Sequence, residues 1–435
     1  MRTNRLAVAA LATMLAAGCG GTTPTAPAAS PAAKAAAAPV TLTYWTWAPN
    51  MDKIVKVWND AHPEIQVTVS KQAGGDDAAA KFLTAAKAGN APDLVQAEYQ
   101  HLPSFIAAEA VADIAKGAAP VKAEFSEGLW GLVTLGTEAV YGIPQDSGPM
   151  MFYYRKDLFE KYGIAVPKTW QEYAEAARKV HRADPKVYLG TFSSKDPGWF
   201  AGLSQQAGAQ WWGINGEAWK VAVNDDATKK VADFWGGLVK EGVIDKQAFF
   251  TPEWNKSLNN GTQLSWPSAV WAPGVLESNA PKAKDKWAVA PLPQWNAGEN
   301  VSGFWGGSAV AVSASSKNTD AAVTFATWLN TESQGVDLLV KEAFIYPAAS
   351  KAQSALGEPP AYFAQSQPDF WQQASTVGAT ARGFTFGPNV GVTYNAYKDG
   401  FDAAVAGRST FGDAVQKMQD ATVADMRKSG FTLAQ

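Results

Sequence analysis

Hydrophobic and polar residues alternate with two different periods from Val40 onward. Residues 40–47 alternate with period two and are rich in Thr, Tyr and Trp, which predicts a strand. The next segment has apolar residues at the spacing of one helical face, namely Met51, Ile54, Val55 and Trp58. A strand over 65–69, a helix ending at Gly89 and a short strand at 94–95 continue the alternation. Strands and helices alternating through short connections predict an α/β sheet with crossover helices.

The same alternation extends through the rest of the chain. Strands are expected at 150–154, 187–192 and 308–312. Thr169 and Glu172 have the spacing of a capping box, which predicts a helix from there to about Arg182. Further helices are expected around 231–238, 323–329 and 394–429, the last one interrupted at Gly407. No repeat of fixed period is present, which argues against a solenoid or a propeller.

The first 39 residues have a different composition. Arg2 and Arg5 precede an uncharged apolar run over 6–17, whose helical length of about 18 Å is well short of a bilayer core of roughly 30 Å. This pattern predicts a secretory signal peptide over 1–18. The small residues before Cys19 resemble the bacterial lipobox, which implies that Cys19 is lipidated and becomes the new N-terminus. The alternative is a buried free cysteine in an N-terminal helix.

Residues 19–39 are predicted to be a disordered tether. From Gly20 the segment consists of Gly, Thr, Ala, Ser and Pro, with Lys34 as its one charge, so it cannot bury enough apolar surface to fold. Such a coil would average roughly 25 Å between its ends. No later stretch has 18 consecutive apolar residues, so no membrane span is expected after the signal peptide.

Composition narrows the classes of function. A chain of 435 residues exceeds what one core usually holds, so two lobes or one large barrel are expected. The net charge of −3, from 37 basic and 40 acidic residues without a basic run, excludes most nucleic-acid binding. One cysteine cannot form an intramolecular disulfide, and with three histidines it forms no usual zinc motif. We therefore expect no metal and no cofactor. The notable excess is 18 tryptophans, a residue type used heavily at binding surfaces.

Motifs of catalysis and nucleotide binding are absent from the sequence. It contains no P-loop, no dinucleotide-binding glycine motif, no nucleophile elbow and no zincin motif. The interpretation is therefore a protein that is not an enzyme. A glycosidase needs a pair of carboxylates at a defined separation, which sequence cannot reveal, so a secreted carbohydrate-active enzyme remains the alternative.

Four segments, in this order, resemble the extracellular solute-binding proteins of ATP-driven importers, in the oligosaccharide-binding group similar to maltose-binding protein. The segments are Tyr44–Trp47, Ala91–Val95, Gly142–Pro144 followed by 151–159 and Pro167–Trp170, and Ser316–Leu329. The resemblance covers nearly the whole mature chain. One departure is Arg155, where the family often has Asn, and we attach no functional meaning to it.

The resemblance implies a two-lobed α/β fold of the periplasmic-binding-protein (Venus-flytrap) type that closes on its ligand about a hinge. It places lobe one at 40–145 plus 306–345 and lobe two at 146–305 plus 346–435. The chain would cross between lobes near 145–147, 301–305 and 346–350. The implied partners are an oligosaccharide and a membrane permease whose ATPase is another chain. The protein would act as a monomer anchored outside the cell. A non-sugar solute in the same fold is a further alternative.

The tryptophans divide into two predicted groups. Trp58, Trp235 and Trp328 lie in step with other inward helical residues, which predicts core packing, and packing or surface positions are also the default for most others. A second group falls on strand ends and loops that the resemblance directs into the cleft, where a flat ring suits the C–H face of a sugar. Its members are Trp45, Trp47, Trp199, Trp266, Trp271 and Trp305.

Polar partners for sugar hydroxyls are carried over by position from the resemblance. They are needed because a buried hydroxyl without a hydrogen-bond partner is costly. The candidates are Glu98, Tyr99, Gln100, Gln145, Asp146 and Asp196, with Phe384 and Asn389 closing the far end of the site. For the carboxylates the alternative is capping of helix N-termini, and for the six tryptophans it is packing between lobes or cover of a strand edge.

Overall fold

The computed structural model describes residues 39–434 with the exception of 73 and 217. The predicted signal peptide, the lipidation of Cys19 and all of the tether except Pro39 lie outside the described residues. From Pro39 onward the chain forms one compact unit. Within this described part, no helix is both long enough and apolar enough to cross a membrane.

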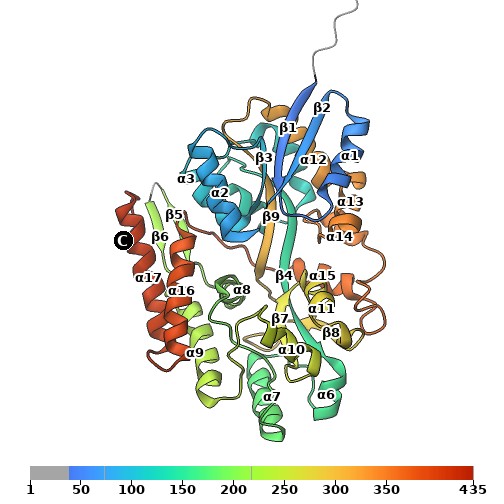
Figure 1. The fold of residues 1–435 in the computed structure, drawn as a ribbon. Coiled ribbons are helices and arrows are strands. Elements are labelled where there is room, and N and C mark those ends of the chain that lie inside the picture. Colours follow the sequence, from blue (N-terminus) through green and yellow to red (C-terminus); the bar gives the residue numbers. More distant parts are fainter. Residues whose placement is uncertain (1–38, 73, 217, 435) are drawn as a thin grey trace, which may run out of the picture. The chain divides into compact units, whose positions relative to one another are not determined.

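The chain begins with three parallel strands that are connected by helices (Figure 1). The strand that comes first in the sequence lies between the other two and pairs with both. These elements are β1 (Val40–Thr46), α1 (Met51–Ala61), β2 (Ile65–Lys71), α2 (Gly75–Lys87) and β3 (Leu94–Glu98). The predicted inner face of α1 is buried, with Ile54 and Trp58 at most 1% exposed. The expected strand–helix alternation is confirmed here.

Two long strands connect this first group to the rest of the fold. β9 (Phe304–Val312) lies antiparallel between β3 and β4 (Ile143–Arg155). The far end of β4 pairs with β7 (Ser265–Ala269) and β8 (Trp287–Pro291), which gives a seven-stranded mixed sheet. The pairing of β4 with β9 is irregular around residues 144–149, where the register shifts twice. The two strands therefore cross the molecule from one group of strands to the other, through a segment that departs from regular pairing.

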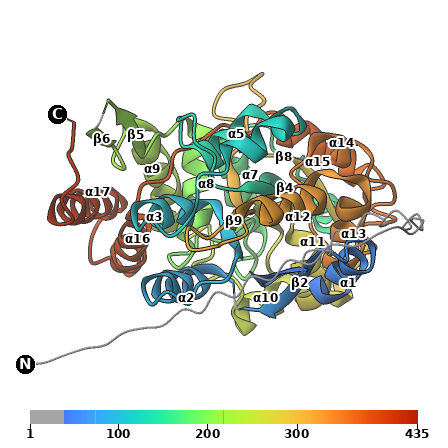
Figure 2. The same ribbon diagram turned by 90° about the horizontal axis from the view of Figure 1, so that it is seen from above.

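Helices cover both groups of strands, and α16 and α17 pack side by side at one edge of the molecule near the β5–β6 hairpin (Figure 2). The remaining elements are α3 (Leu102–Ala107), α4 (Ala115–Ala118), α5 (Glu127–Thr134), α6 (Lys156–Tyr162), α7 (Trp170–Ala183), α8 (Pro197–Ala207), β5 (Trp212–Asn215), β6 (Ala218–Val221), α9 (Asp226–Glu241), α10 (Pro252–Asn260), α11 (Ala272–Asn279), α12 (Thr319–Thr331), α13 (Ser333–Ala343), α14 (Ser350–Ser354), α15 (Phe370–Gly378), α16 (Val390–Val405) and α17 (Phe411–Lys428). Three short 3₁₀ helices are η1 (Tyr99–His101), η2 (Ala119–Glu124) and η3 (Pro281–Ala283).

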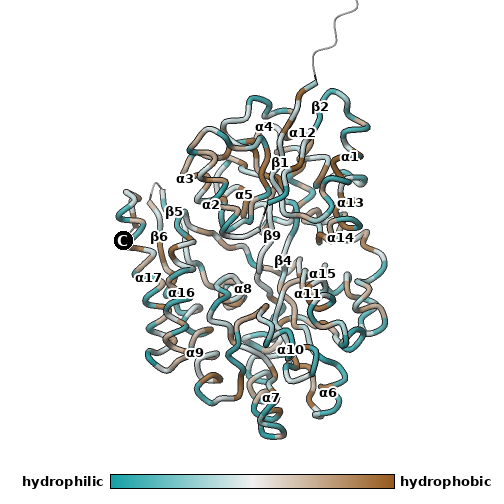
Figure 3. The backbone as a smooth tube through the Cα atoms, in the orientation of Figure 1, coloured by the Kyte–Doolittle hydropathy of each residue, from teal (hydrophilic) through white to brown (hydrophobic). Residues whose placement is uncertain are grey.

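Outer helices alternate between hydrophobic and hydrophilic residues along their length, as helices with one buried face do (Figure 3). In α9 the residues at Val231, Trp235 and Leu238 are buried, as the period of the sequence predicted. Trp58, Trp235 and Trp328 are at most 3% exposed, so the predicted packing of these three tryptophans is confirmed.

The predicted strand over 187–192 was wrong. The structure has two isolated bridges there, from Tyr188 to Gln263 and from Thr191 to Asp245. A Cβ atom on Gly190 would lie 1.9 Å from the hydroxyl of Tyr173, so α7 approaches the backbone closely at this point. Glycine within an extended segment often marks such a close approach and weakens regular strand pairing.

The predicted capping box of α7 is only half formed. The Thr169 side chain accepts the Glu172 backbone N–H at 3.1 Å, which satisfies one free amide of the helix N-terminus. The Glu172 carboxylate accepts a bond from the Lys168 backbone at 2.6 Å instead of from that of Thr169. The helix still begins where the pattern predicted, at Trp170.

The three expected crossing segments meet in space. The Ser147 backbone N–H donates to Tyr346 at 3.2 Å, and the Ala348 N–H donates to Gln145 at 3.1 Å. Pro149, two residues after Ser147, pairs with Phe304 of the third segment in the β4–β9 ladder. Segments far apart in sequence thus lie hydrogen-bonded beside one another where the β4–β9 pairing is irregular. The exact lobe boundaries stay predictions.

Candidate functional site

A nearly closed pocket of about 10 Å³ lies where the end of β3 faces α8 and α16. One wall comes from Tyr99 and Gln100 of η1 and from Leu132 of α5. The other residues that line it are Gly198, Gln205, Phe304, Gly306, Phe386 and Tyr394. This volume is about the space of one water molecule and far below the roughly 300–1,000 Å³ usual for small-molecule sites. A disaccharide would therefore need the two walls to move apart before it could enter.

Tyr99 connects the pocket to the crossing segments. Its hydroxyl donates to the backbone carbonyl of Asp146 at 2.9 Å. Burial raises the pKa of Tyr99 well above its usual value, and the nearby Asp146 charge raises it further. Gly307 has a φ of +103°, and a Cβ atom there would lie 2.8 Å from the Tyr99 ring. Only glycine fits this conformation and this close approach without strain.

Asp146 lies at the end of a chain of buried polar groups. Its carboxylate accepts hydrogen bonds from the backbone N–H and the hydroxyl of Ser308. The Gln96 amide donates to Ser308 at 3.0 Å and accepts from the Thr46 hydroxyl at 2.6 Å and from the Trp47 backbone at 3.2 Å. Burial raises the pKa of Asp146 to about 6, against the opposing effect of the Ser308 bonds. The network thus links the end of β1 to the segment where the chain crosses.

Two partly exposed tryptophans, Trp271 and Trp305, lie beside the pocket without lining it. The rings of Trp271 and Trp305 lie 4.7 Å apart between centroids and are nearly perpendicular, at 71°. The Trp271 indole N–H donates to the Trp305 carbonyl at 2.8 Å, which fixes the start of β9. A Cβ atom on Gly198 would lie 3.1 Å from the Trp305 ring, so this ring lies next to Gly198, which lines the pocket. The predicted role of both tryptophans in ligand binding stays a prediction.

Of the fourteen predicted contacts, Tyr99 and Gln100 line this pocket and the other twelve do not. Trp199 is fully buried, and its indole N–H donates to the Pro267 carbonyl at 2.9 Å. Trp266 is 1% exposed in β7, behind Trp271 and Trp305. We leave both out of the proposed site because core packing already accounts for them.

Phe384 and Asn389 are also engaged outside the pocket. Phe384 packs against Trp211 with 5.6 Å between ring centroids, and it borders a separate open hollow beside α5. The Asn389 amide donates to the Thr422 carbonyl and to the Asp425 carboxylate, both at 3.0 Å, and so ties the start of α16 to α17. These contacts give each residue a structural role in its own helix or loop.

Of the remaining aromatic candidates, Trp45 and Trp47 are partly exposed at the end of β1 and just after it. The ammonium group of Lys81 lies 4.9 Å from the Trp45 ring centroid, within the range of a cation–π contact. The Trp47 ring faces Gly74, where a Cβ atom would lie 3.4 Å away. Both rings therefore contact α2 and the residues just before it.

The remaining polar candidates make contacts within the fold. Glu98 accepts a bond from Gln100 at 2.8 Å and lies 3.6 Å from the His101 ring nitrogen. Gln145 is 1% exposed and donates to the Tyr44 hydroxyl at 3.4 Å. Asp196, just before α8, accepts from the Ser193 hydroxyl, and burial raises its pKa to about 6.

Seven of the nine residues that line the pocket escaped the sequence prediction: Leu132, Gly198, Gln205, Phe304, Gly306, Phe386 and Tyr394. Phe386 lies two positions after the predicted Phe384, in the same segment. Gln205 and Gln206 form a polar pair within the otherwise apolar helix α8, and both are at most 3% exposed. A buried pair of amides is an unusual pattern, and it was the one signal in the sequence that could have indicated Gln205.

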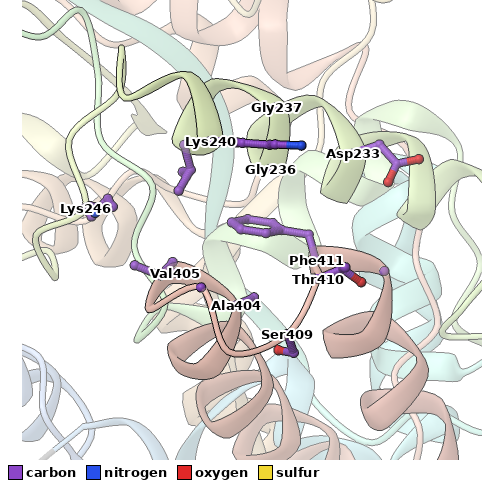
Figure 4. A pocket seen from close by; sticks show the side chains of 13 residues that line it. Asp233, Gly236, Gly237, Lys240, Lys246, Ala404, Val405, Ser409, Thr410 and Phe411 are labelled. Atoms are coloured by element: carbon purple, nitrogen blue, oxygen red, sulfur yellow. The ribbon is translucent and has the colours of Figure 1, made fainter.

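A larger hollow of about 550 Å³ lies between α9 and the connection from α16 to α17 (Figure 4). Its lining is mostly glycine, alkyl groups and the side chains of Lys240 and Lys246, with the ring of Phe411 between the helices. A Cβ atom on Gly236 would lie 2.8 Å from the Phe411 ring, so this glycine allows the helices to pack closely. The helix N-terminus here is already satisfied by the capping box of Thr410 and Asp413. We assign no ligand to this hollow.

The sequence matches the family of bacterial extracellular solute-binding proteins over residues 44–336. The chain belongs to this family. It is 25% identical over 300 residues to an arabinooligosaccharide-binding protein of Halalkalibacterium halodurans, covering 65% of this chain and 66% of that protein. It is 26% identical over 304 residues to a lactose-binding protein of Rhizobium radiobacter, covering 65% of this chain and 69% of that protein. The matches thus span about two thirds of these relatives.

The fold is similar to that of a two-lobed sugar-binding protein of known structure. This is the galacto-N-biose/lacto-N-biose I-binding protein of the ABC transporter from Bifidobacterium longum, in complex with lacto-N-biose. The TM-score is 0.81 at 28% identity, and the match covers 92% of this chain and 100% of the other. The two-lobed α/β fold expected from the sequence is confirmed. The family acts outside the membrane and consists of binding proteins.

Proposed function

We propose that this protein captures a neutral oligosaccharide at the pocket between η1, α5, α8, β9 and α16 and delivers it to the permease of an ATP-driven importer. The observation that carries the proposal is the chemistry of the pocket wall, where aromatic rings alternate with amide side chains. Rings suit the C–H face of a sugar, and amides and backbone groups suit its hydroxyls. The sugar-binding relatives and the similar structure support the same class of ligand.

The proposed site comprises a polar side and an aromatic side. The polar side is Glu98, Tyr99, Gln100 and Asp146, near the crossing segments, and the aromatic side is Trp271, Trp305, Phe386 and Tyr394. Because the pocket is narrow, the open form would admit the sugar and the closed form would retain it, so binding itself would favour closure. The proposed polypeptide partners are the two membrane subunits of the permease and a separate ATPase.

Lipid attachment at Cys19 completes the proposal. A tether over 19–39 would let the binding lobes reach the permease from the membrane surface. Replacing Cys19 with Ser would release the protein from the membrane fraction into the medium or periplasm, while sugar affinity stays unchanged. A Cys19→Ser protein that remains in the membrane fraction as the parent does would contradict the anchoring.

The sugar assignment is tested with the full chain by calorimetry and tryptophan fluorescence against arabinooligosaccharides, lactose, lacto-N-biose and maltose. We expect at least one of them to bind more tightly than millimolar. A matched control is Trp219→Ala, which removes a partly buried tryptophan of the β5–β6 hairpin outside the pocket and should bind the same sugar equally well. If no neutral sugar binds below millimolar concentration, the sugar assignment fails.

The same sugar, labelled and incubated overnight, separates binding from catalysis. A binding protein returns the intact oligosaccharide in stoichiometric amount. Release of shorter products at a rate proportional to protein concentration would favour a carbohydrate-active enzyme, and the proposed transport function would then be wrong.

A further inference from the structure

One buried amide in the pocket is only half used by the protein. Gln205 is 1% exposed and lines the pocket from α8. Its Oε1 accepts the backbone N–H of Phe304 at 2.9 Å. Its Nε2 is buried without a hydrogen-bond partner among the described residues. A buried donor without a partner is unfavourable, so this position has a free-energy cost that a suitable ligand atom would remove.

The orientation of this amide is fixed by the fold. The Phe304 N–H requires an acceptor, so the oxygen of Gln205 must face β9 and the nitrogen must face the other way. Gly303 makes this approach possible, because a Cβ atom there would lie 2.0 Å from the Gly202 carbonyl and 3.1 Å from the Gln205 Cβ. β9 and α8 are thus packed so closely that Gln205 has little freedom to turn its amide over.

The neighbouring glutamine shows that the helix position alone does not explain the unused donor. Gln206 is 3% exposed on the same helix, and the protein uses both ends of its amide. Its Oε1 accepts the Trp170 indole N–H at 2.9 Å, and its Nε2 donates to the Pro293 carbonyl at 2.8 Å. The two adjacent glutamines are both buried, but only Gln205 lines the pocket, and only Gln205 has a side-chain N–H group without a hydrogen-bond partner among the described residues.

We infer that the Nε2 of Gln205 donates a hydrogen bond to one hydroxyl oxygen of the bound sugar and thereby selects which hydroxyl lies deepest in the pocket. This inference rests on the proposed function and makes it more specific. Aromatic rings accept many sugars because every pyranose has an apolar face, whereas a fixed donor at the base discriminates between hydroxyl positions. Gln205 is thus a specificity-determining residue in the pocket that Tyr99 and Gln100 also line.

The test uses Gln205→Met, which keeps the length of the side chain and removes the donor. With lacto-N-biose, or lactose if that sugar binds more tightly, the Kd should rise about tenfold, as expected for one lost hydrogen bond. The matched control is Gln206→Met, which should lower the unfolding temperature and change the Kd less than twofold. Equal affinity of Gln205→Met and the parent, or equal weakening in both variants, would overturn the inference.

A series of monodeoxy analogues of the same sugar gives a readout that a purely structural role would not change. The parent should bind one of the deoxy analogues about tenfold more weakly than the complete sugar. Gln205→Met should bind that analogue and the complete sugar with affinities that differ by less than twofold. If the Met variant does not fold, Gln205→Glu replaces it, because a carboxylate still accepts the Phe304 N–H but cannot donate. If the variant still loses about tenfold in affinity for that deoxy analogue, the inference is wrong and the proposed function stands. If the parent binds no sugar at all, both the proposed function and this inference are wrong.

Discussion

Two regions of this molecule use tryptophan in opposite ways. In the first, which we call the tryptophan core, Trp170, Trp199 and Trp235 are at most 2% exposed and pack edge to face, with centroids 5.0 Å apart for Trp199 and Trp235. In the second, at the pocket, Trp271 and Trp305 are partly exposed with centroids 4.7 Å apart. The geometry of the pairs is similar, so ring contact alone does not separate packing from binding.

The two regions differ in how much of each tryptophan ring remains accessible. In the core, the Trp170 and Trp199 indoles donate to Gln206 and to Pro267, and the rings are enclosed. At the pocket, the Trp271 N–H holds the Trp305 backbone, while part of both rings stays accessible. A side chain that is already enclosed by the protein contributes to stability, and one with an accessible face can contribute to affinity.

The largest expected effect is on the core. Trp235→Ala should lower the free energy of unfolding by about 3–5 kcal/mol, because it removes a fully buried ring and leaves a cavity. Denaturant unfolding measures the change, and calorimetry on the folded protein should give an unchanged sugar affinity. A decrease in the free energy of unfolding of less than about 1 kcal/mol would contradict the assignment of Trp235 to the tryptophan core, since Trp235 would then behave like a surface residue.

Charge provides the second prediction, at the pocket side of the comparison. Because burial raises the pKa of Asp146 to about 6 in the folded protein from an ordinary value of 3.8, the folded state binds more protons between about pH 4 and pH 6. The carboxylate of Asp146 is therefore destabilising above pH 6, and protonation relieves this cost as the pH falls. Asp146→Asn, whose amide oxygen still accepts from Ser308, should be more stable than the parent at pH 8, on the order of 2 kcal/mol.

Unfolding of both proteins without sugar, from pH 4 to pH 8, measures this difference. The advantage of the variant should decrease as the pH falls below 6 and disappear near pH 4. Asp196, whose pKa is also raised to about 6, is present in both proteins and cancels in the comparison. A variant less stable than the parent at pH 8 would show that the Ser308 contacts outweigh the cost of burial.

The smallest expected effect is on affinity. Trp305→Ala should weaken sugar binding about tenfold, roughly 1.4 kcal/mol, because one aromatic contact with the ligand is lost. Its effect on unfolding should be smaller than that of Trp235→Ala, because part of the Trp305 ring is exposed. If both Trp271→Ala and Trp305→Ala bind as tightly as the parent, the sugar is held elsewhere and the division between the two regions fails.

The sequence predicted the elements and missed the pocket lining for identifiable reasons. The period of α1 and α9 identified the buried positions of both helices, because one face of a helix must be apolar to pack. The strand at 187–192 failed because Tyr173, remote in sequence, approaches Gly190. Trp199 was predicted at the site because it follows Asp196, a predicted cleft residue, but the first turn of α8 directs it into the core.

The sequence by itself determined the α/β class, the family and the packing of Trp58, Trp235 and Trp328, because periodicity and short motifs are local properties. Only the tertiary structure decided which polar groups remain unpaired and which rings remain accessible. Gln205 and Gln206 are indistinguishable in sequence, yet β9 leaves one donor unused while Pro293 occupies the other. Such differences depend on contacts between segments that are about 90 residues apart or more, such as the contacts of α8 with β9 and with Pro293. A local sequence pattern contains no information about these contacts.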